Sequence, residues 1–335
     1  MGYKAEKDRI ESKIKIAKRI TLCVVLAIVL ALCIFSAFVP ASTWKYYVGK
    51  PKISKLEAGE MRIHFLDVGQ GDSTLIEFPD GKVMLVDGGN GENQTATKLM
   101  RYLNALSIKT IDYLVVSHAD SDHCGGLDVV VKNKRILNAY LPNVVASVNK
   151  EYAELYSALL KEKCARVFSS RETNLSVTEG YPYQLSFLYP YSESLEAEAE
   201  KEEDNNASSS VIWLDYQGVS ALLTGDAPLE TETLLMRDDK LGLFKNRDVD
   251  LTSTEILKVA HHGSASSTGA EFLQYLNVTT AVISCGKNNE YRHPSEATLT
   301  RLQQKNVNVY RTDEQGNILV SVKKSGEMTV KKIKN

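Results

Sequence analysis

The sequence has few cysteines and no internal repeat. Its 335 residues include five cysteines: Cys23, Cys33, Cys124, Cys164 and Cys285. The first two lie in an apolar N-terminal run and the other three are far apart, so the sequence predicts no disulfide framework. No repeat is visible at the periods typical of solenoids, which excludes that architecture.

Positive charge is scarce in most of the chain. Residues 1–61 contain 11 Lys and Arg against 5 Asp and Glu, whereas residues 62–335 contain 29 against 37, a net charge of −8. Affinity for a nucleic-acid backbone comes mostly from Lys and Arg, so the second part is not a general nucleic-acid binder. Bound cations would offset part of the negative charge locally. The balance therefore weakens a polynucleotide substrate without excluding one.

A long apolar run stands near the N-terminus. Residues 1–19 are polar and basic, and residues 20–39 contain no charged side chain. Twenty helical residues rise about 30 Å, the thickness of a bilayer core. The basic residues before the run predict a cytoplasmic segment at 1–19, a transmembrane anchor at 20–39 and an extracytoplasmic remainder. Residues 40–60 are interpreted as a tether.

A cleaved signal peptide is the alternative to an anchor. Its apolar region is usually about 7–15 residues long, which is shorter than the run seen here. Both interpretations place the rest of the chain outside the cytoplasm, either at the cell membrane or secreted.

Candidate metal ligands are concentrated in residues 117–126, Ser-His-Ala-Asp-Ser-Asp-His-Cys-Gly-Gly. An apolar run just before them predicts a buried strand. The ligand-type side chains are His118, Asp120, Asp122 and His123. Two glycines then turn the chain, which allows these side chains to converge. Imidazole suits zinc and carboxylate suits manganese or magnesium, so the mixture predicts two neighbouring cations rather than a polar surface loop.

Three further apolar runs end in residues of the same kinds. Residues 83–86 precede Asp87, residues 221–225 precede Asp226, and residues 255–260 precede His261 and His262. The two oxygens of one carboxylate can span two cations about 3.5–4 Å apart. His64, by contrast, lies among apolar residues and is interpreted as a structural histidine.

Other elements are predicted from the same patterns. We expect helices at 95–106, 150–163, 230–237 and 295–304, the last with Ser295 as its N-cap. Strands are expected at 62–68, 73–78, 83–86, 181–190, 211–214 and 280–285. The Glu-rich residues 192–204 predict a solvated helix or loop. Residues 310–318 predict a hairpin that closes the sheet.

The motif at 117–126 resembles the His-x-His-x-Asp-His signature of the metallo-β-lactamase superfamily, with Asp120 in place of the second His. Three other stretches make the chain similar to the hydrolase domain of ComEC-type competence proteins. They are Phe-Leu-Asp-Val-Gly-Gln-Gly-Asp at 65–72, the Asn- and Ser-rich stretch at 205–210, and His-Pro-Ser at 293–295. The resemblance implies an α+β, four-layer αββα sandwich over residues 61–335.

The resemblance also implies roles for individual residues. Asp122, His123, His262 and Asp226 would hold one metal ion. His118 and Asp120, together with Asp226, would hold a second. This second position is rich in oxygen, because a His common in the superfamily is missing there. We therefore expect two divalent ions, manganese or zinc, with magnesium also suitable.

Further residues are expected around the metals. Asp87 and Asn206 would support the site, and Ser210 would occupy the place of the missing His. His261 would face substrate, although the order of the two adjacent histidines stays open. Arg292 and His293 would hydrogen-bond a phosphate or protonate a leaving oxygen, and the same segment can simply cap the following helix. Asp122, His261 and His293 are the residues expected to take part in catalysis.

Three functions follow as hypotheses. The first is an extracytoplasmic, membrane-anchored nuclease that cleaves DNA through a metal-bridged hydroxide, during uptake or scavenging. ComEC-type proteins usually also have a multi-helix channel, and with a single span this chain is not expected to translocate DNA itself. The second is a phosphodiesterase for cell-surface polymers or small phosphoesters, and the third a non-catalytic metal-containing module. Hydrolysis of β-lactams is disfavoured by Asp120 and the missing His. No protein partner is indicated.

Overall fold

The computed structural model describes residues 2–38, 40–173, 175, 180, 183–191 and 205–334. The chain consists of two compact units, Met1–Val48 and Gly49–Asn335. The first contains α1 (Gly2–Phe38) and the short 3-10 helix η1 (Ala41–Tyr46). Over Glu6–Phe38, α1 is long and apolar enough to cross a membrane, a property shared by signal sequences near an N-terminus. Helix α1 is continuous through residue 19. The predicted boundaries of the membrane span at residues 19 and 39 therefore stay a prediction.

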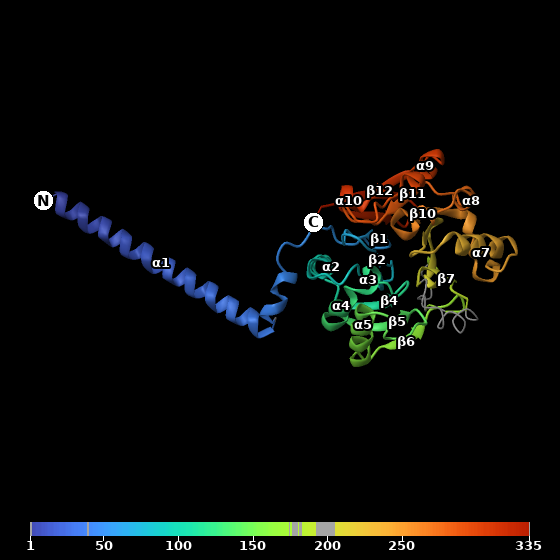
Figure 1. Cartoon of the computed structure of the whole chain (residues 1–335). Helices are drawn as coiled ribbons and strands as arrows, with labels where there is room; N and C mark the ends of the chain where they lie inside the picture. The colour runs from blue at the N-terminus through green and yellow to red at the C-terminus, as the bar shows by residue number, and fades with distance from the viewer. Residues whose placement is uncertain are drawn as a thin grey trace. The chain divides into compact units, whose positions relative to one another are not determined.

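The second unit contains two sheets (Figure 1). The larger has eight strands in the order β14-β13-β1-β2-β3-β4-β5-β6. Its strands are β1 (Met61–Phe65), β2 (Thr74–Glu77), β3 (Val83–Val86), β4 (Thr110–Val115), β5 (Arg135–Leu141), β6 (Ala165–Phe168), β13 (Asn317–Val322) and β14 (Met328–Ile333).

The smaller sheet has six strands in the order β12-β11-β10-β9-β8-β7. Its strands are β7 (Tyr183–Tyr189), β8 (Val211–Tyr216), β9 (Val219–Leu223), β10 (Thr254–Lys258), β11 (Thr280–Ile283) and β12 (Asn308–Arg311).

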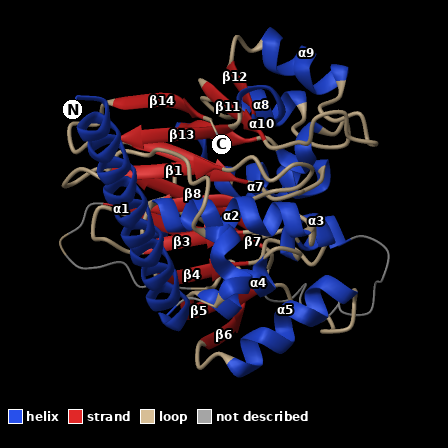
Figure 2. Cartoon of the chain, turned by 90° about the vertical axis from the view of Figure 1, so that its left-hand side faces the viewer, coloured by secondary structure: helices blue, strands red, loops and turns tan. Residues whose placement is uncertain are grey.

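Helices lie on the outer faces of both sheets. The larger sheet is accompanied by α2 (Asn93–Ala105), α3 (Ser121–Cys124), α4 (Leu127–Asn133) and α5 (Lys150–Lys161), as Figure 2 shows. The smaller sheet packs against α7 (Leu229–Lys240), α8 (Ala270–Tyr275) and α9 (Glu296–Gln304). The short α10 (Thr312–Gln315) follows β12. The 3-10 helices of this unit are η2 (Asn205–Ser208), η3 (Lys245–Arg247), η4 (Leu251–Ser253) and η5 (Ala260–Gly263).

Strand β8 illustrates why the sheets stack. Ile212 and Leu214 point into the core between the two sheets, whereas Val211 and Trp213 pack in the core that includes the outer helices. Successive side chains of a strand face opposite sides of the sheet, so a strand that is apolar on both faces must be covered on both. The order is therefore helices, sheet, sheet, helices, which confirms the predicted αββα sandwich.

The topology gathers several strand ends at one edge. Strands β3 to β6 run parallel to one another, as do β9 to β12. Strand β1 is antiparallel to β2, and β2 to β3, so β1 runs in the same direction as β3. The segments that follow β1, β3, β4, β9 and β10 carry Asp72, Asp87, residues 117–126, Asp226 and His262. These segments are the source of the candidate site.

Three predictions about local structure had different outcomes. The hairpin expected at 310–318 is wrong, because β12 pairs in parallel with β11 in the smaller sheet while β13 pairs with β1 and β14 in the larger. The antiparallel hairpin at this end of the chain is β13–β14 instead. The Glu-rich residues 192–204 lie outside the described residues. Ser295 caps α9 as predicted, with its side chain accepting from the Thr298 N–H.

Candidate metal centre

The turn after β1 brings Asp72 to the site. Gly71 precedes it with φ +129°, in the region that favours glycine. A Cβ on Gly71 would collide with the carbonyl oxygen of Asp122. The Asp72 N–H donates to that same oxygen at 3.1 Å, and the Asp72 carbonyl accepts from the Gly89 N–H at 2.7 Å. The glycine thus lets this turn pack directly against the segment that carries the other ligands.

The segment after β4 forms a single helical turn, α3. The N–H of His123 donates to the Asp120 carbonyl at 3.0 Å, which folds the chain back on itself. His118 and His123 are buried with ring centroids 4.0 Å apart, while Asp122 stays partly exposed. Asp120 accepts a hydrogen bond from the Asn205 side chain at 2.7 Å. The turn brings both imidazoles of the motif to the same side.

The smaller sheet contributes from the ends of β9 and β10. Asp226 follows β9 and is buried. His261 and His262 follow β10 with φ of +49° and +52°, an uncommon backbone conformation for residues other than glycine. Such backbone conformations concentrate at functional sites. Here they direct the buried His262 ring toward Asp226, with 3.4 Å between His262 Nε2 and Asp226 Oδ2.

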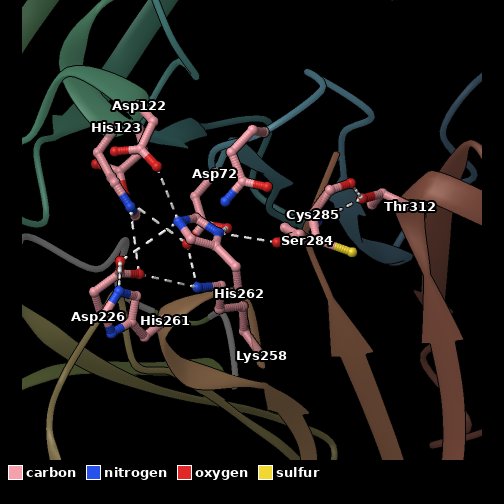
Figure 3. A network of polar contacts seen from close by, with 12 residues as sticks. Asp72, Asp122, His123, Asp226, Lys258, His261, His262, Ser284, Cys285 and Thr312 are labelled. Carbon is pink, nitrogen blue, oxygen red and sulfur yellow. Dashed lines mark hydrogen bonds and ion pairs between the residues drawn. The ribbon is translucent and has the colours of Figure 1, made fainter. Parts of the chain in front are cut away.

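Four of these side chains form a compact cluster, which Figure 3 shows from close by. One ligand atom from each of Asp72, His123, Asp226 and His262 lies within 4.8 Å of the others, and all four residues are buried. Asp122 adjoins the cluster, with its Oδ2 at 3.1 Å from His262 Nε2. Residues from both sheets therefore meet at one place.

The three buried imidazoles of the site, those of His118, His123 and His262, are each oriented by a hydrogen bond at Nδ1. That of His123 bonds to Asp87 Oδ2 at 2.9 Å, and that of His262 bonds to the Ser284 carbonyl at 2.9 Å. His118 Nδ1 lies 3.0 Å from Ser117 Oγ, which in turn donates to Asp87 at 2.6 Å. Metal-binding histidines are typically oriented by such a bond on the other ring nitrogen.

The inward-facing atoms fit a bound cation. Within the described part of the chain, five buried atoms of the cluster and of His118 have no hydrogen-bond partner: Nε2 of His118, His123 and His262, and one oxygen each of Asp72 and Asp226. Buried polar groups are nearly always hydrogen-bonded. Imidazole nitrogens and carboxylate oxygens that converge on one point are suited to a divalent metal. We take the cluster as a divalent metal site on this ground.

The metal-free site has strongly displaced protonation equilibria. Burial acts to lower the pKa of His262, but Asp226, Asp72 and Asp122 outweigh it and raise this pKa to about 10. The pKa of His123 is raised well above its ordinary value, because Asp226 and Asp87 likewise outweigh burial. Burial favours a higher pKa for Asp226, yet the two imidazoles lower it well below its usual range. Without metal, the cluster is thus a set of imidazolium–carboxylate pairs.

Lys258 completes the charges of the site. Its Nζ contacts Asp72, lies 3.7 Å from Asp226 Oδ1 and donates to the Gly225 carbonyl at 2.9 Å. The pKa of Lys258 is raised although burial opposes this, because both carboxylates favour the ammonium form. Neither Lys258 nor Asp72 was anticipated as part of the site. The Gly-Gln-Gly-Asp run is a local signal from which Asp72 could have been predicted. Lys258, in contrast, lies in an apolar strand and has no such signal.

The outer side of the site is formed by histidines that stay partly exposed. His261 Nε2 lies 3.8 Å from Asp226 Oδ2, and its side chain is 28% exposed. The His293 ring centroid lies 5.4 Å from that of His261 and 6.3 Å from that of His262. Arg292 is exposed with φ +57°, and its N–H donates to the Asn289 carbonyl. The structure thus brings His261 and His293 together beside the cluster.

Of the two neighbouring serines Ser209 and Ser210, it is Ser209 whose hydroxyl lies next to the site. Ser209 Oγ lies 3.4 Å from His118 Nδ1 and accepts from the Asp226 N–H at 3.1 Å. Ser210 Oγ turns away to Ser169 Oγ at 2.8 Å. Ser210, which is expected in the place of the missing His, thus stands one position after the hydroxyl that lies beside His118. The Asn206 carbonyl accepts from the Ser209 N–H at 3.0 Å and helps to place it.

His64, outside the site, is a hydrogen-bonded structural histidine as predicted. Its Nδ1 lies 2.9 Å from the Tyr102 hydroxyl and its Nε2 2.9 Å from Glu77 Oε2. Both ring nitrogens are occupied by protein partners, which leaves none for a ligand.

A family model described as the metallo-beta-lactamase superfamily matches residues 66–287. The chain belongs to this superfamily. The match begins at the end of β1 and extends beyond β11, so it includes Asp72, residues 117–126, Asp226 and His262. The family match and the cluster together indicate a metal-dependent hydrolase.

Competence proteins are among the similar curated proteins. ComE operon protein 3 of Bacillus subtilis is 33% identical over 279 residues, which cover 78% of this chain and 33% of that protein. Recombination protein 2 of Haemophilus influenzae is 30% identical (78% of this chain, 29% of that protein), and competence protein ComA of Neisseria gonorrhoeae is 27% identical (80% and 33%). The chain thus spans about a third of the length of these relatives, and it is related to the ComEC-type branch of the metallo-β-lactamase superfamily.

Proposed function

We propose that this chain is a metal-dependent phosphodiesterase that cleaves DNA outside the cytoplasm and is held at the cell membrane through residues 20–39. The observation that carries the proposal is the set of buried, unpartnered imidazole and carboxylate atoms at the shared edge of the two sheets. Relatives named for competence and recombination, processes that act on DNA, support the substrate. The apolar α1 supports the membrane location.

In this proposal the ligands divide between two divalent ions, manganese or zinc. Asp122, His123, His262 and Asp226 would hold one, and His118, Asp120 and Asp226 the other. Asp72 adjoins the first group and is available to it. Divalent ions bound in pairs lower the pKa of a water nucleophile and hold the nonbridging oxygens of a phosphodiester.

The residues of the chain would prepare the site for that chemistry. Asp87 accepts from His123 Nδ1 and the Ser284 carbonyl accepts from His262 Nδ1. These bonds favour the tautomer in which an unprotonated Nε2 faces inward. Burial, with the positive charges of His262 and Lys258, lowers the pKa of His261 although Asp226 opposes this. A neutral, partly exposed His261 would donate its N–H to a phosphate oxygen.

His293 would act in the same way. Burial is the largest cause that lowers the pKa of His293 to about 4, followed by repulsion from the protonated His262 and, when it also takes up a proton, from His261. At neutral pH its ring is then uncharged, so it suits a hydrogen bond to substrate better than protonation of a leaving oxygen. Arg292, next to it, would add a positive charge beside the phosphate.

The net charge of −8 over residues 62–335 favours a second candidate, a phosphodiesterase for cell-surface polymers or small phosphoesters. A negatively charged domain repels a long polyanion more than a short one. The two candidates share the metal site and differ only in what the surrounding surface accepts.

The test is an assay of the full-length protein in detergent with labelled single- and double-stranded DNA and a small phosphodiester. Manganese, magnesium and zinc are supplied in turn. We expect cleavage of DNA that is lost in Asp122→Ala and kept in Asp128→Ala, a carboxylate on α4 that pairs with Lys132. Intact DNA under all three metals, with the small diester cleaved, would favour the second candidate. Metal binding without any cleavage would favour a non-catalytic module.

A further inference from the structure

A rigid loop stands beside the outer histidines of the site. Residues 286–293, here called the Asn289 loop, follow β11. The Asn289 side chain donates to the carbonyls of Gly286 at 2.8 Å and His293 at 2.6 Å, and it accepts from the His293 N–H at 2.9 Å. The Asn289 carbonyl accepts from the Arg292 N–H at 3.2 Å. One side chain therefore binds both ends of the loop and fixes its shape.

The Asn289 loop is also fixed to the metal centre. The Gly286 N–H donates to Gln70 Oε1 at 3.0 Å, and a Cβ on Gly286 would lie only 2.6 Å from the Gln70 nitrogen. Gln70 belongs to the same tight turn as Asp72. The loop is thus held in a constant position relative to the ligands.

Tyr291 projects from this loop with one face of its ring covered. That face stacks on His293, with ring centroids 5.7 Å apart and an angle of 23° between the rings. The side chain is nevertheless 68% exposed, so its other face is open to solvent. His293 in turn lies 6.3 Å from His262. Tyr291 is therefore two ring-to-ring steps from a candidate ligand.

The charges of the Asn289 loop suit a polyanion. Lys287 and Arg292 are exposed and positive, and Glu290 is the one acidic residue between them. The loop thus has a net positive charge within a domain that is negative as a whole. A phosphate backbone approaching the metals would meet a net positive charge on this loop.

We propose that Tyr291 is a base-stacking subsite, which receives an unpaired nucleobase on its open face while the adjoining phosphodiester lies at the metal centre. Aromatic side chains beside a positive surface bind single-stranded nucleic acids by stacking on successive bases. A polymer without bases has nothing to stack there. This inference rests on the proposed phosphodiesterase function and adds to it the class of substrate: a nucleotide chain with at least one unpaired base.

The experiment compares two single-stranded oligonucleotides of equal length and charge, one with normal bases and one with abasic residues throughout. Full-length protein is assayed for kcat and KM on both, and binding of both is measured by fluorescence anisotropy in chelator. Stacking of one base predicts a KM about 5- to 100-fold lower for the base-bearing strand. Tyr291→Ala should raise that KM to the abasic value and leave the abasic strand unchanged. Tyr291→Trp and Tyr291→Phe should keep the preference.

Tyr156→Ala, on α5 with its ring against Tyr152, is the matched control and should behave as the parent protein. Equal KM values for the two strands in the parent protein, or a parallel loss on both strands in Tyr291→Ala, would overturn the subsite. A protein that cleaves neither strand refutes the proposed function, and the anisotropy then decides the subsite separately. A base preference that Tyr291→Ala removes supports it, and equal binding of both strands overturns it.

Discussion

Lys258 and Asp72 form a buried ion pair inside the candidate metal centre. Their side chains are 3% and 5% exposed, and the same ammonium lies 3.7 Å from Asp226 Oδ1. Two of the carboxylates that face the cluster therefore have a permanent positive neighbour supplied by the protein. A divalent ion bound here would therefore be held by carboxylates whose charge Lys258 already offsets in part.

Replacing this lysine should make folding depend on metal. In Lys258→Met the buried carboxylate of Asp72 loses its ammonium partner and keeps only the imidazoles of His262 and His123. Breaking such a buried pair typically costs about 3–5 kcal/mol of unfolding free energy. A divalent ion can compensate the carboxylates in part, so added manganese should restore more stability to the variant than to the parent protein. Denaturant unfolding with manganese and with chelator measures both effects.

Lys134→Met is the control for that experiment. Lys134 is also buried, but its Nζ donates to Asn104 and to the Ile108 carbonyl and contacts no carboxylate of the site. Its loss should destabilise the protein equally with and without metal. If manganese stabilises the two variants to the same extent, Lys258 has no special relation to the metal centre.

Asp87 should control metal affinity through His123. In Asp87→Asn the acceptor that orients His123 Nδ1 is weakened, and such changes commonly reduce metal affinity about 10- to 100-fold. Equilibrium dialysis followed by metal analysis measures the loss. Asp238→Asn is the matched control, since Asp238 is equally buried but pairs with Arg171 and Tyr191 away from the site. An unchanged affinity in Asp87→Asn would contradict the assigned role.

Metal affinity should rise with pH. The metal-free pKa of His262 is about 10 and that of His123 is raised well above 6.5, so protons compete with the metal for both nitrogens at neutral pH. The same shifts stabilise the metal-free fold: since the folded pKa of His262 exceeds the unfolded value, this stability is complete below pH 6.5 and is lost as the pH rises toward 10.

Two measurements check this linkage. Manganese titrations between pH 6.5 and 9 should show a steadily lower apparent Kd with release of up to two protons, and unfolding of the chelated protein should become easier over that range. Both trends should be smaller in His262→Gln. A Kd independent of pH would show that these imidazoles do not bind the metal.

Gly71 should be essential for placing Asp72. Gly71→Ala adds a methyl group that meets the Asp122 carbonyl, in addition to the cost of a positive φ. Gly81→Ala also carries the cost of a positive φ (+85°), about 1–2 kcal/mol, but nothing lies within 4 Å of its Cβ. We expect Gly71→Ala to be the more destabilised variant and the only one of the two to lose metal. Equal metal content would indicate that the turn can move without consequence.

The proposed orientation of α1 in a membrane can be tested by cysteine labelling. Ser325→Cys lies in the exposed turn between β13 and β14, and Lys7→Cys lies in the basic N-terminal segment. A membrane-impermeant maleimide added to intact cells should label the first above the background of the parent protein and label the second only after lysis. The reverse pattern would place the catalytic unit in the cytoplasm.

Local sequence signals were sufficient for most elements of the fold. Apolar runs that end in Asp87, Asp226 and His262 indicate strands followed by functional turns, because in parallel strands such ends share one edge of a sheet. The predicted hairpin at 310–318 was wrong because local signals do not show how strands pair. A single apolar run after Gly316 does not show which of two sheets a strand joins, since that depends on pairing with β1, about 250 positions earlier.

The site was predictable where its residues lie close in sequence and less so where they do not. His118, Asp120, Asp122 and His123 fall within one turn, so their convergence follows from the chain itself. Lys258 faces the cluster only because β9 and β10 are adjacent, and three consecutive serines do not show which hydroxyl lies beside His118.

The two sheets contribute to the cluster at widely separated points of the chain, Asp72 before β2 and His262 after β10. During synthesis the first of these residues is made long before the last, so a growing polypeptide cannot hold the ion in this geometry. Loading must wait until the whole sandwich has closed. If the catalytic unit matures beyond the membrane, the metal it acquires is set by what the surroundings of the cell supply, not by the internal metal pool.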